Sequence, residues 1–597
     1  VEPEPAETEQ PVEPEPAEPE QPVEPEPAET EQPVEPEPVE PEQPVEPEPV
    51  EPEQPVEPEP VEPEQPVDPE PAETEQPVEP EPVEPEQPVD PEPSESEQVS
   101  APALVPGSGF SGPTAQPGHI GTGYGADAKA IARWNVVPYR AFEGTLEIGV
   151  IAFHMAGIDR VEFSVDNGPW QAVHEMTRNP RTETDEYWVK LDAGTFPASG
   201  PVEVRAIVYP NKGLPRVLGG PTYDGATRKY SNHGEHSLPL YADTAPDGDA
   251  LSPGVCYVSP HGDDEAGDGT LDAPFATITR AATGIAEKTS DNVIDGGVVY
   301  LLPGDHVYTH RSWRDGAMST RHTHLTITRA PGTERDEVRV VRGEGSGLNT
   351  KLIRFKGLTL VRPAGGELFT TGGQTETYFW IDDCAMQGPS IDLHDDGDWF
   401  LNTSHASVTG TTVSHNKNGL INVQLIRDVA IHDVASNAFA GYGMVVNSTV
   451  TRIYRTADNT HDWHPDLLQV RGGASNRIAY GVKAGPDVSS RGFSPSGGLE
   501  MAVVNCHLDN QTRSGTLPPG ANATGSMHVF EASRELEHIY IKGSTFVGPA
   551  RWATDSTGFS LHNVVIEQST FSGQLPYVPA PWDLEGIEYR PGLSLYD

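Results

Sequence analysis

The chain has only three cysteines, no long apolar run and, in its first 99 residues, no lysine or arginine. Without about 18 consecutive apolar residues, the sequence predicts no transmembrane helix. The cysteines, Cys256, Cys384 and Cys506, lie far apart and match no zinc-ligand spacing. Cys384 and Cys506 stand in strand-like sequence, so we expect buried thiols in place of a disulfide. Cysteine usage therefore leaves the cellular compartment undecided.

Basic residues are outnumbered along the whole chain, which carries a formal net charge of -54. Residues 1–99 hold 36 acidic residues, and the rest of the chain carries only -18. Phosphate contacts require a basic surface, so we expect no nucleic-acid partner. A length of 597 residues predicts several structural units. The chain begins at Val1, and we expect a processed form or a fragment.

Residues 1–99 consist of nine copies of an 11-residue repeat, VEPEPAETEQP, with small variations. Proline at this density excludes helix and sheet, and the segment has too little apolar surface to offset its ordering entropy. We therefore predict a disordered segment with polyproline II character. One interpretation is a charged stalk that associates with the cell surface or cell wall, and the other is a solubilising tail.

A Gly/Pro/Ser-rich linker at 100–128 precedes a region of short alternating strands at 129–245. In RVEFSV, Val161, Phe163 and Val165 share one face, and VEVRAIVYP repeats this alternation. About 115 residues of this kind predict an immunoglobulin-like or fibronectin-III-like β-sandwich. Such a module is typically accessory, and we assign no chemistry to it.

Residues 250–597 carry the signature of a solenoid, in which equivalent residues recur once per coil. LEHIYIKGSTFVG, from Leu536, matches LHNVVIEQSTFSG, from Leu561, at an offset of 25 residues. Looser copies place Cys384 and Cys506 where this pair has Ser544 and Ser569. Inward apolar residues that stack on the next coil explain the match.

The entrance to this region, from Tyr257 to Tyr308, combines two short strands with an amphipathic helix. Pro274 marks the expected helix start, and the apolar face follows as Phe275, Ile278, Ala282 and Ile285. We interpret the preceding GDDEAGDG as a turn and not as a calcium loop. The order resembles the start of secreted right-handed parallel β-helix proteins of the pectate-lyase-like kind. The resemblance implies a mostly β chain whose right-handed parallel β-helix carries an N-terminal capping helix.

One stretch of the solenoid, residues 458–471, is exceptionally polar for a coil. Its run HPDLLQ resembles the His-x-Asp-x-x-Gln run of carbohydrate-active β-helix proteins, which include lyases and epimerases. By this resemblance His464, Asp466 and Gln469 match the pattern. The catalytic candidates are His464, Asp466, His461 and Arg471, and the substrate-binding candidates are Gln469, Trp463, Asp462, Asn459, Lys483, His415 and Lys417.

The chemistry of this stretch is open to several interpretations. A lyase would use His464 or His461 as base and Arg471 or Arg455 to neutralise a uronate. The acid that protonates the leaving oxygen would be Tyr454 or Lys483. A glycoside hydrolase would use two carboxyl groups, for which Asp462 and Asp466 are candidates. His464 and Asp466 could alternatively hold a turn between strands. We expect no cofactor and no metal site, with Ca²⁺ at the His461, Asp462, His464 and Asp466 set as the alternative.

The function expected from these features is that of a secreted or cell-surface protein whose partner is a polysaccharide. We predict lyase-like β-elimination on an acidic polysaccharide. The alternatives are a non-catalytic adhesin or glycan-binding rod displayed on the stalk, and a glycoside hydrolase. The solenoid sequence is acidic overall and has no obvious basic stretch that could line a groove. This composition counts against a polyanionic substrate.

Overall fold

The structure is a computed structural model that describes residues 101–107 and 125–596 apart from loop segments. The longer segments outside the described residues are 245–253, 309–318, 344–351, 371–377, 390–399, 457–464, 515–520, 552–560 and 573–586. Contacts divide the chain at Glu92, and residues from Pro93 to Asp597 form one compact unit. The repeat region 1–99 lies outside the described residues, so its predicted disorder stays a prediction. No described helix is long and apolar enough to cross a membrane.

The first part of this unit, residues 131–242, is a β module of two sheets. One sheet has the order β1 (Ile131–Trp134), β3 (Thr145–Phe153), β7 (Thr184–Asp192) and β6 (Thr177–Asn179). The other has the order β2 (Arg140–Phe142), β12 (Leu238–Ala242), β8 (Gly200–Pro210), β4 (Ile158–Val165) and β5 (Gln171–Val173), with β9 (Arg216–Leu218) paired to β8. A 3-10 turn spans Ala193–Thr195, and the short strands β10 (Tyr223–Asp224) and β11 (Lys229–Tyr230) pair with each other. As the alternation predicted, Val161, Phe163 and Val165 are fully buried. An immunoglobulin-like or fibronectin-like topology stays a prediction.

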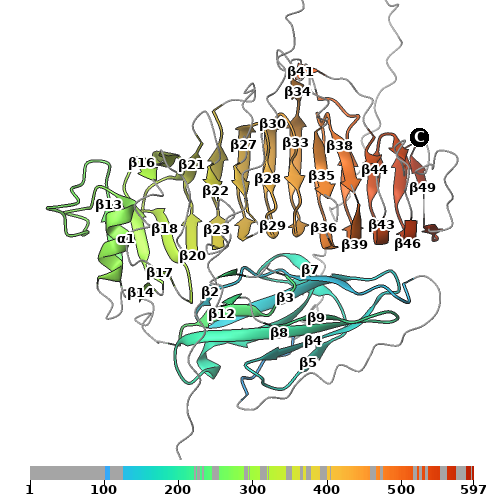
Figure 1. Cartoon of the computed structure of the whole chain (residues 1–597), viewed down its shortest axis with the longest axis horizontal. Helices are drawn as coiled ribbons and strands as arrows, with labels where there is room; N and C mark the ends of the chain where they lie inside the picture. The colour runs from blue at the N-terminus through green and yellow to red at the C-terminus, as the bar shows by residue number, and fades with distance from the viewer. Residues whose placement is uncertain are drawn as a thin grey trace, which may run out of the picture. The chain divides into compact units, whose positions relative to one another are not determined.

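Residues 255–596 form a parallel β-helix, whose strands follow one another along its length in chain order (Figure 1). The chain visits three parallel sheets in turn, named sheets 1, 2 and 3 here. Sheet 1 contains thirteen strands: β13 (Val255–Val258), β15 (Val298–Leu301), β18 (Leu325–Arg329), β20 (Leu352–Lys356), β23 (Tyr378–Asp382), β26 (Ala406–Thr409), β29 (Leu425–Arg427), β32 (Met444–Val446), β36 (Ser475–Tyr480), β39 (Gly498–Val504), β43 (Leu536–Lys542), β46 (Leu561–Glu567) and β48 (Ile587–Tyr589).

Sheets 2 and 3 complete each coil. Sheet 2 contains β16 (Gly304–Tyr308), β19 (Val338–Arg342), β21 (Thr359–Val361), β24 (Ala385–Gln387), β27 (Thr412–Asn416), β30 (Ala430–Val434), β33 (Thr449–Ile453), β37 (Lys483–Ala484), β40 (His507–Asp509), β44 (Thr545–Val547), β47 (Thr570–Ser572) and β49 (Ser594–Tyr596). Sheet 3 contains β22 (Phe369–Thr370), β25 (Leu401–Asn402), β28 (Leu420–Ile421), β31 (Phe439–Ala440), β35 (Asp466–Val470), β38 (Arg491–Pro495), β42 (Phe530–Glu531) and β45 (Ala550–Arg551). Outside the three sheets, β14 (Val293–Ile294) pairs with β17 (Ser319–Thr320), β34 (Arg455–Thr456) pairs with β41 (Ala521–Asn522), and a 3-10 turn spans Arg335–Glu337.

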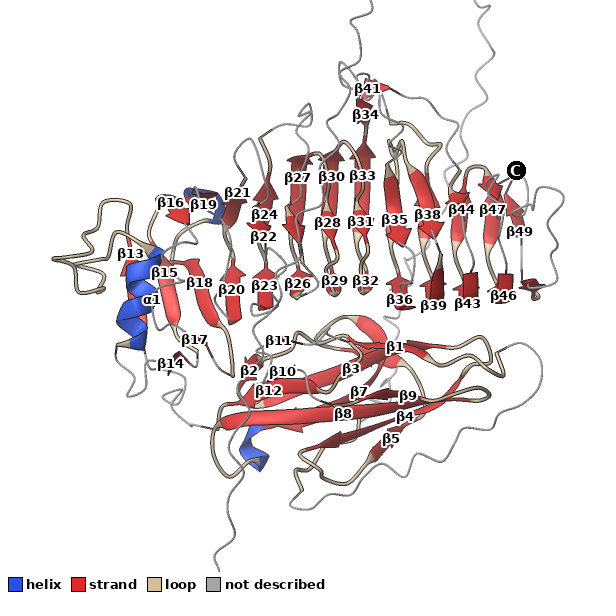
Figure 2. Ribbon diagram, viewed as in Figure 1, coloured by secondary structure: helices blue, strands red, loops and turns tan. Residues whose placement is uncertain are grey.

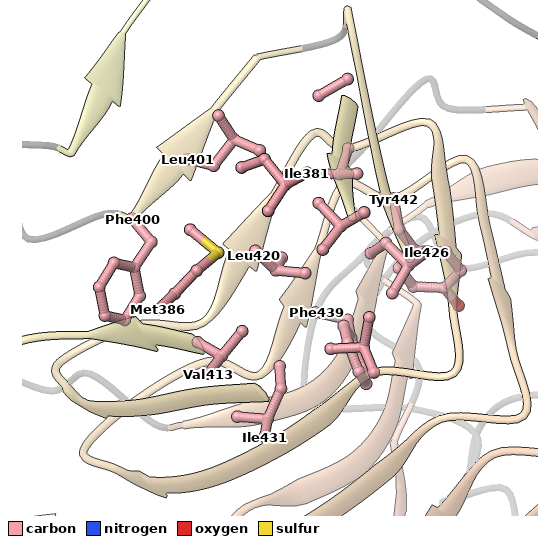
Figure 3. Packing of buried hydrophobic residues seen from close by; sticks show 14 of the residues in the cluster. Ile381, Met386, Phe400, Leu401, Val413, Leu420, Ile426, Ile431, Phe439 and Tyr442 are labelled. Atoms are coloured by element: carbon pink, nitrogen blue, oxygen red, sulfur yellow. The ribbon is translucent and has the colours of Figure 1, made fainter. Parts of the chain in front are cut away.

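The core of the β-helix is a stack of apolar residues from successive coils (Figure 3). The predicted repeat pair lies in register: Leu536 pairs with Leu561 and Ile541 with Ile566. The Phe546 and Phe571 rings stack with centroids 4.9 Å apart. The pattern therefore predicted the coil register correctly.

All three cysteines are free and buried, as predicted for Cys384 and Cys506. Cys506 and Ser544 form one column, because the Cys506 amide donates to Ser544 Oγ at 3.2 Å and the Ser544 amide donates to Ser569 Oγ at 3.2 Å. Burial raises the pKa of the Cys506 thiol to about 12. These thiols are therefore interior packing groups and not nucleophiles.

Helix α1 (Ile278–Ala286) lies at the start of the β-helix beside β13 (Figure 2). It begins later than Pro274, the predicted start, because Thr277 is the N-cap and its Oγ1 accepts from the Arg280 amide at 3.1 Å. Phe275 is buried but forms a β-bridge with Val258. The GDDEAGDG segment is the predicted turn, since Asp263 Oδ1 accepts from the Glu265 and Ala266 amides at 2.8 and 2.9 Å.

The β module covers the outer face of sheet 1 from β20 to β46 through one continuous cluster of buried residues. From the β-helix the cluster takes Leu352, Tyr378, Trp380, Leu425, Met444, Val446, Ile478, Tyr480, Ala502, Val504, Tyr540 and Val565, and from the module Ala128, Ile131, Val137, Tyr139, Ile151, Phe153 and Met155. Because this face is buried, a polymer groove on the β-helix is left to sheets 2 and 3 and to the turns between them.

Candidate functional site

Six of the residues predicted for the site lie in segments outside the described residues. Asn459, His461, Asp462, Trp463 and His464 belong to 457–464, and Arg471 belongs to 471–474. Their assignments stay predictions. The predicted residues that the structure places are Asp466 and Gln469 on β35, Lys483 on β37, and His415 and Lys417 at the end of β27.

Asp466 is fully buried in an ion pair with Arg491 on the next coil. Its Oδ1 accepts from Arg491 Nε at 2.6 Å, and its Oδ2 accepts from Arg491 Nη2 at 2.9 Å and from Gln469 Nε2 at 2.6 Å. Leu468 and Val470 are buried in the core, and Gln469 is half-buried. In this arrangement Asp466 positions the strand, which is the role expected if the polar residues hold a turn.

A ladder of asparagines leads to Asp466 along the sheet 2–sheet 3 turns. Asn437 Oδ1 accepts from the Asp466 amide at 2.9 Å, and Asn418 Oδ1 accepts from the Asn437 amide at 3.3 Å. All three side chains are buried. The ladder fixes the backbone where the chain enters sheet 3, and Asp466 is its charged end.

A second set of polar residues is aligned at the same edge, where the strands of sheet 2 end. His415 lies opposite Asp433, and Asp433 opposite Arg452, because the register pairs Asn416 with Val434 and Val434 with Ile453. A bridge between Ile453 and Val488 brings Asp487 next in line. All four have positive φ, from 52° to 62°. We name His415, Asp433, Arg452 and Asp487 the turn column.

The centre of the turn column is a hydrogen-bonded group of three side chains. Arg452 Nε donates to Asp433 Oδ1 at 2.8 Å and its Nη2 donates to Oδ2 at 2.7 Å. His432 Nδ1 lies 2.8 Å from Asp433 Oδ2. The hydrogen bonds from Arg452, aided by His432, lower the pKa of Asp433 to about 2. Asp433 is therefore ionised and cannot serve as a proton donor near neutral pH.

His432 has the geometry of a base oriented by a carboxylate. His432 Nδ1 lies near both Asp433 Oδ2, at 2.8 Å, and Arg452 Nη2, at 3.1 Å. In the tautomer whose Nδ1 carries the proton, Nδ1 donates to Asp433 and Nε2 keeps its lone pair; in the other tautomer Nδ1 accepts from Arg452 and Nε2 carries the proton. The base role belongs to the first tautomer. The ring is half-buried and meets the exposed His415 ring edge-on, with centroids 6.2 Å apart. The arrangement can accept a proton at Nε2 from a ligand at this edge.

Tyr454 and Asp487 complete the described part of this edge. Burial and the carboxylates of Asp433 and Asp487 raise the pKa of Tyr454. Asp487 accepts from the amide of Ser514 at 2.9 Å and from its hydroxyl. The segment 457–464, which carries the predicted histidines, follows Tyr454 and β34 directly in the chain.

The sequence identified one member of the turn column, His415, together with its neighbour Lys417. It missed His432, Asp433, Arg452 and Asp487, because no motif in the sequence marks them. A signal was nonetheless present: single Asp or His residues near strand ends are enriched at positive φ. Lys483 is exposed on β37 of sheet 2. Asp466 lies on sheet 3, so the structure places these two predicted site residues on different sheets.

Comparisons with known proteins assign no family to the chain. No family model matches it, and no curated protein matches it. Among solved structures, a GH136 lacto-N-biosidase from Eubacterium ramulus shares 11% identity, with coverage of 59% of this chain and 69% of that chain and a TM-score of 0.25. A similarity with that TM-score is too weak to indicate a function for this chain. The candidate function therefore rests on the residues of the site.

Proposed function

We propose that this protein is an extracellular carbohydrate-active β-helix that cleaves an acidic polysaccharide by β-elimination at the sheet 2–sheet 3 edge. The observation that carries the proposal is the His432–Asp433 pair, an imidazole held by an ionised carboxylate with its second nitrogen available. Elimination needs a base for the proton on C5 of a uronate, and this is the chemistry that an oriented neutral imidazole supplies.

In the proposed reaction, His432 Nε2 takes the C5 proton and the electron pair forms the C4–C5 double bond. The C4–O bond breaks, and the leaving oxygen receives a proton from an acid, for which His461, His464 and Tyr454 are candidates. Asp433 is a positioning residue, because it acts through His432. The uronate carboxylate would be met by Lys417 at this edge. Arg471, the cation predicted from the sequence, follows the other end of β35 and lies outside the described residues.

The charge of the turn column favours glycoside hydrolysis as a second candidate. Asp433 and Asp487 stand two coils apart with Arg452 between them, about 10 Å apart at the backbone from the strand spacing. That spacing suits two carboxyl groups of an inverting hydrolase. The low pKa of Asp433 restricts it to the base role, and the acid would then have to be Asp487 or Asp462.

The test follows unsaturated uronate by ultraviolet absorbance and reducing ends in parallel, on a panel of acidic and neutral polysaccharides. We expect absorbance on an acidic substrate and a loss of about 10²- to 10⁴-fold in kcat/KM for His432→Ala. Asp433→Asn should lower kcat with little change in KM. His507→Ala is the matched control, because His507 is exposed on β40 of the same sheet.

The outcomes separate the candidate functions. Reducing ends without absorbance would replace elimination by hydrolysis. Full activity in His432→Ala with loss in His464→Ala would move the base to residues 457–464. Saturable glycan binding without any product would leave the rigid adhesin or glycan-binding rod as the function.

A further inference from the structure

A cluster of metal-ligand side chains lies where the start of the β module meets the far end of sheet 1. Asp127 precedes the module, whereas His538 and His562 lie on β43 and β46. One ligand atom from each residue lies within 4.8 Å of the other two. Residues more than 400 positions apart in the chain therefore converge on one point.

These residues belong to a row of polar groups by which sheet 1 holds the β module. Asn476, Glu500, His538 and Asn563 have positive φ and occupy equivalent positions in successive coils. Asn476 exchanges hydrogen bonds with the backbone of Ala132, at 2.9 and 3.0 Å, and Glu500 pairs with Arg216. In the next two coils, at β43 and β46, the row continues with His538 and Asn563, and the residue that faces them is Asp127.

The geometry of the group is that of ligands gathered around one small centre. His562 Nε2 lies 2.8 Å from Asp127 Oδ2, and the His538 and His562 rings lie 5.5 Å apart. The Asn563 amide nitrogen lies 3.1 Å from His538 Nδ1 and 3.2 Å from His562 Nε2, and it also bonds Asp127 Oδ1. Because His562 Nε2 donates to Asp127 Oδ2, the two Asn563 amide hydrogens are left for Asp127 Oδ1 and His538 Nδ1.

We propose that Asp127, His538 and His562 bind a first-row divalent cation of the zinc class. Two imidazoles and one carboxylate form a ligand set that suits zinc and its neighbours and disfavours Ca²⁺ and Mg²⁺, which prefer oxygen ligands. Ligand atoms around tetrahedral zinc lie about 3.3 Å apart, so side-chain rotation brings this set into range. The cation takes the place of the Asn563 amide nitrogen, and water fills the remaining coordination position.

The cation in this site acts as a clasp between the start of the β module and the β-helix. The Asn563 amide holds the same three groups together when no cation is bound, and its Oδ1 accepts from the Gly125 amide at 3.2 Å. Binding therefore strengthens a junction that already exists. The proposal does not depend on the catalytic function, because this site lies on the covered sheet and not on the sheet 2–sheet 3 edge.

The experiment titrates Zn²⁺ by calorimetry, and Co²⁺ by visible absorbance, into untagged full-length protein stripped with a chelator. We expect one cation per chain, at least tenfold weaker binding for His538→Ala and for His562→Ala, and unchanged or tighter binding for Asn563→Ala. His507→Ala controls for exposed histidines in general. The far-ultraviolet circular dichroism of each variant verifies its fold.

A double variant, His461→Ala with His464→Ala, separates this site from the predicted histidine-rich segment. Stoichiometric binding that survives this double variant and is lost in His562→Ala supports the clasp. Absence of stoichiometric binding overturns it, as does binding that is lost in the double variant and kept in His538→Ala and His562→Ala. Zn²⁺ should also slow proteolysis of the chain before Asp127 in the wild type and not in His562→Ala.

Discussion

At the scale of one residue, Asp466 of the polar motif stabilises the fold through its contacts with Arg491 and Gln469. Its carboxylate is buried and ion-paired with Arg491, so removing it leaves a buried guanidinium without its counter-charge. We expect Asp466→Ala to lower the free energy of unfolding by about 3–5 kcal/mol. Urea denaturation followed by circular dichroism measures this change.

The matched control for Asp466 is Asp305, which pairs with Arg339 at 3.2 Å where both side chains are about half exposed. Asp305→Ala should cost about 0–1 kcal/mol, because water screens the pair. Equal losses of unfolding free energy in Asp466→Ala and Asp305→Ala would show that burial does not make the Asp466–Arg491 pair more important than an exposed pair. Activity lost in Asp466→Asn without a loss of stability would instead make Asp466 part of the catalytic site.

The lowered pKa of Asp433 predicts how the stability of the protein depends on pH. Its pKa is lowered from 3.8 to about 2 in the folded protein, so the folded state holds its proton less tightly than the unfolded state. This pairing therefore adds stability in full above about pH 4, and the contribution is lost as the pH falls through about 2. Carbon-13 NMR of the aspartate carboxyls should show this low titration, and Arg452→Gln should return it toward 3.8. An Asp433 titration unchanged in Arg452→Gln would refute the assigned cause.

At the scale of elements, the strands and their register were predictable from sequence, whereas the bulges within them were not. Period-two alternation and the 25-residue repeat determine which side chains enter the core, as Leu536 over Leu561 shows. A positive-φ bulge adds one residue to a strand and turns its side chain outward without changing the flanking pattern. His538 and Arg452 therefore look like ordinary strand residues in the sequence.

The start of α1 was misplaced for a similar reason. Phe275 has the spacing of a helical apolar face, but its backbone pairs with Val258, and a side-chain cap at Thr277 sets the first turn. The two histidines of residues 457–464 stay predictions. The structure adds the His432–Asp433 pair at that edge. The winding of the chain into coils brings this pair there, and no spacing in the sequence indicates it.

At the scale of the whole molecule, the β module and the β-helix share one buried surface. Arg133 Nη2 donates to Gln424 Oε1 at 2.6 Å across 291 residues of sequence, and Arg427 Nη1 donates to Asn135 Oδ1 at 3.0 Å. Burial lowers the pKa of Arg133 to about 9. These hydrogen bonds between the two parts could not be predicted from the sequence. The β module and the β-helix each show a complete strand pattern, and neither pattern indicates a contact with the other.

We expect residues 250–597, expressed without the β module, to expose the apolar outer face of sheet 1. Leu425, Met444 and Ile478 lie in adjacent strands of that face and are fully buried in the intact chain. Large exposed apolar patches drive association, so the truncated protein should bind a hydrophobic dye and elute as oligomers in size-exclusion chromatography. Replacing these three residues by serine, threonine and glutamine in the truncated protein should restore a monomer, since the β-helix core lies on the other side of the sheet. A monomeric, dye-negative truncation without these replacements would mean that the two parts fold as independent domains and that the module is a removable accessory.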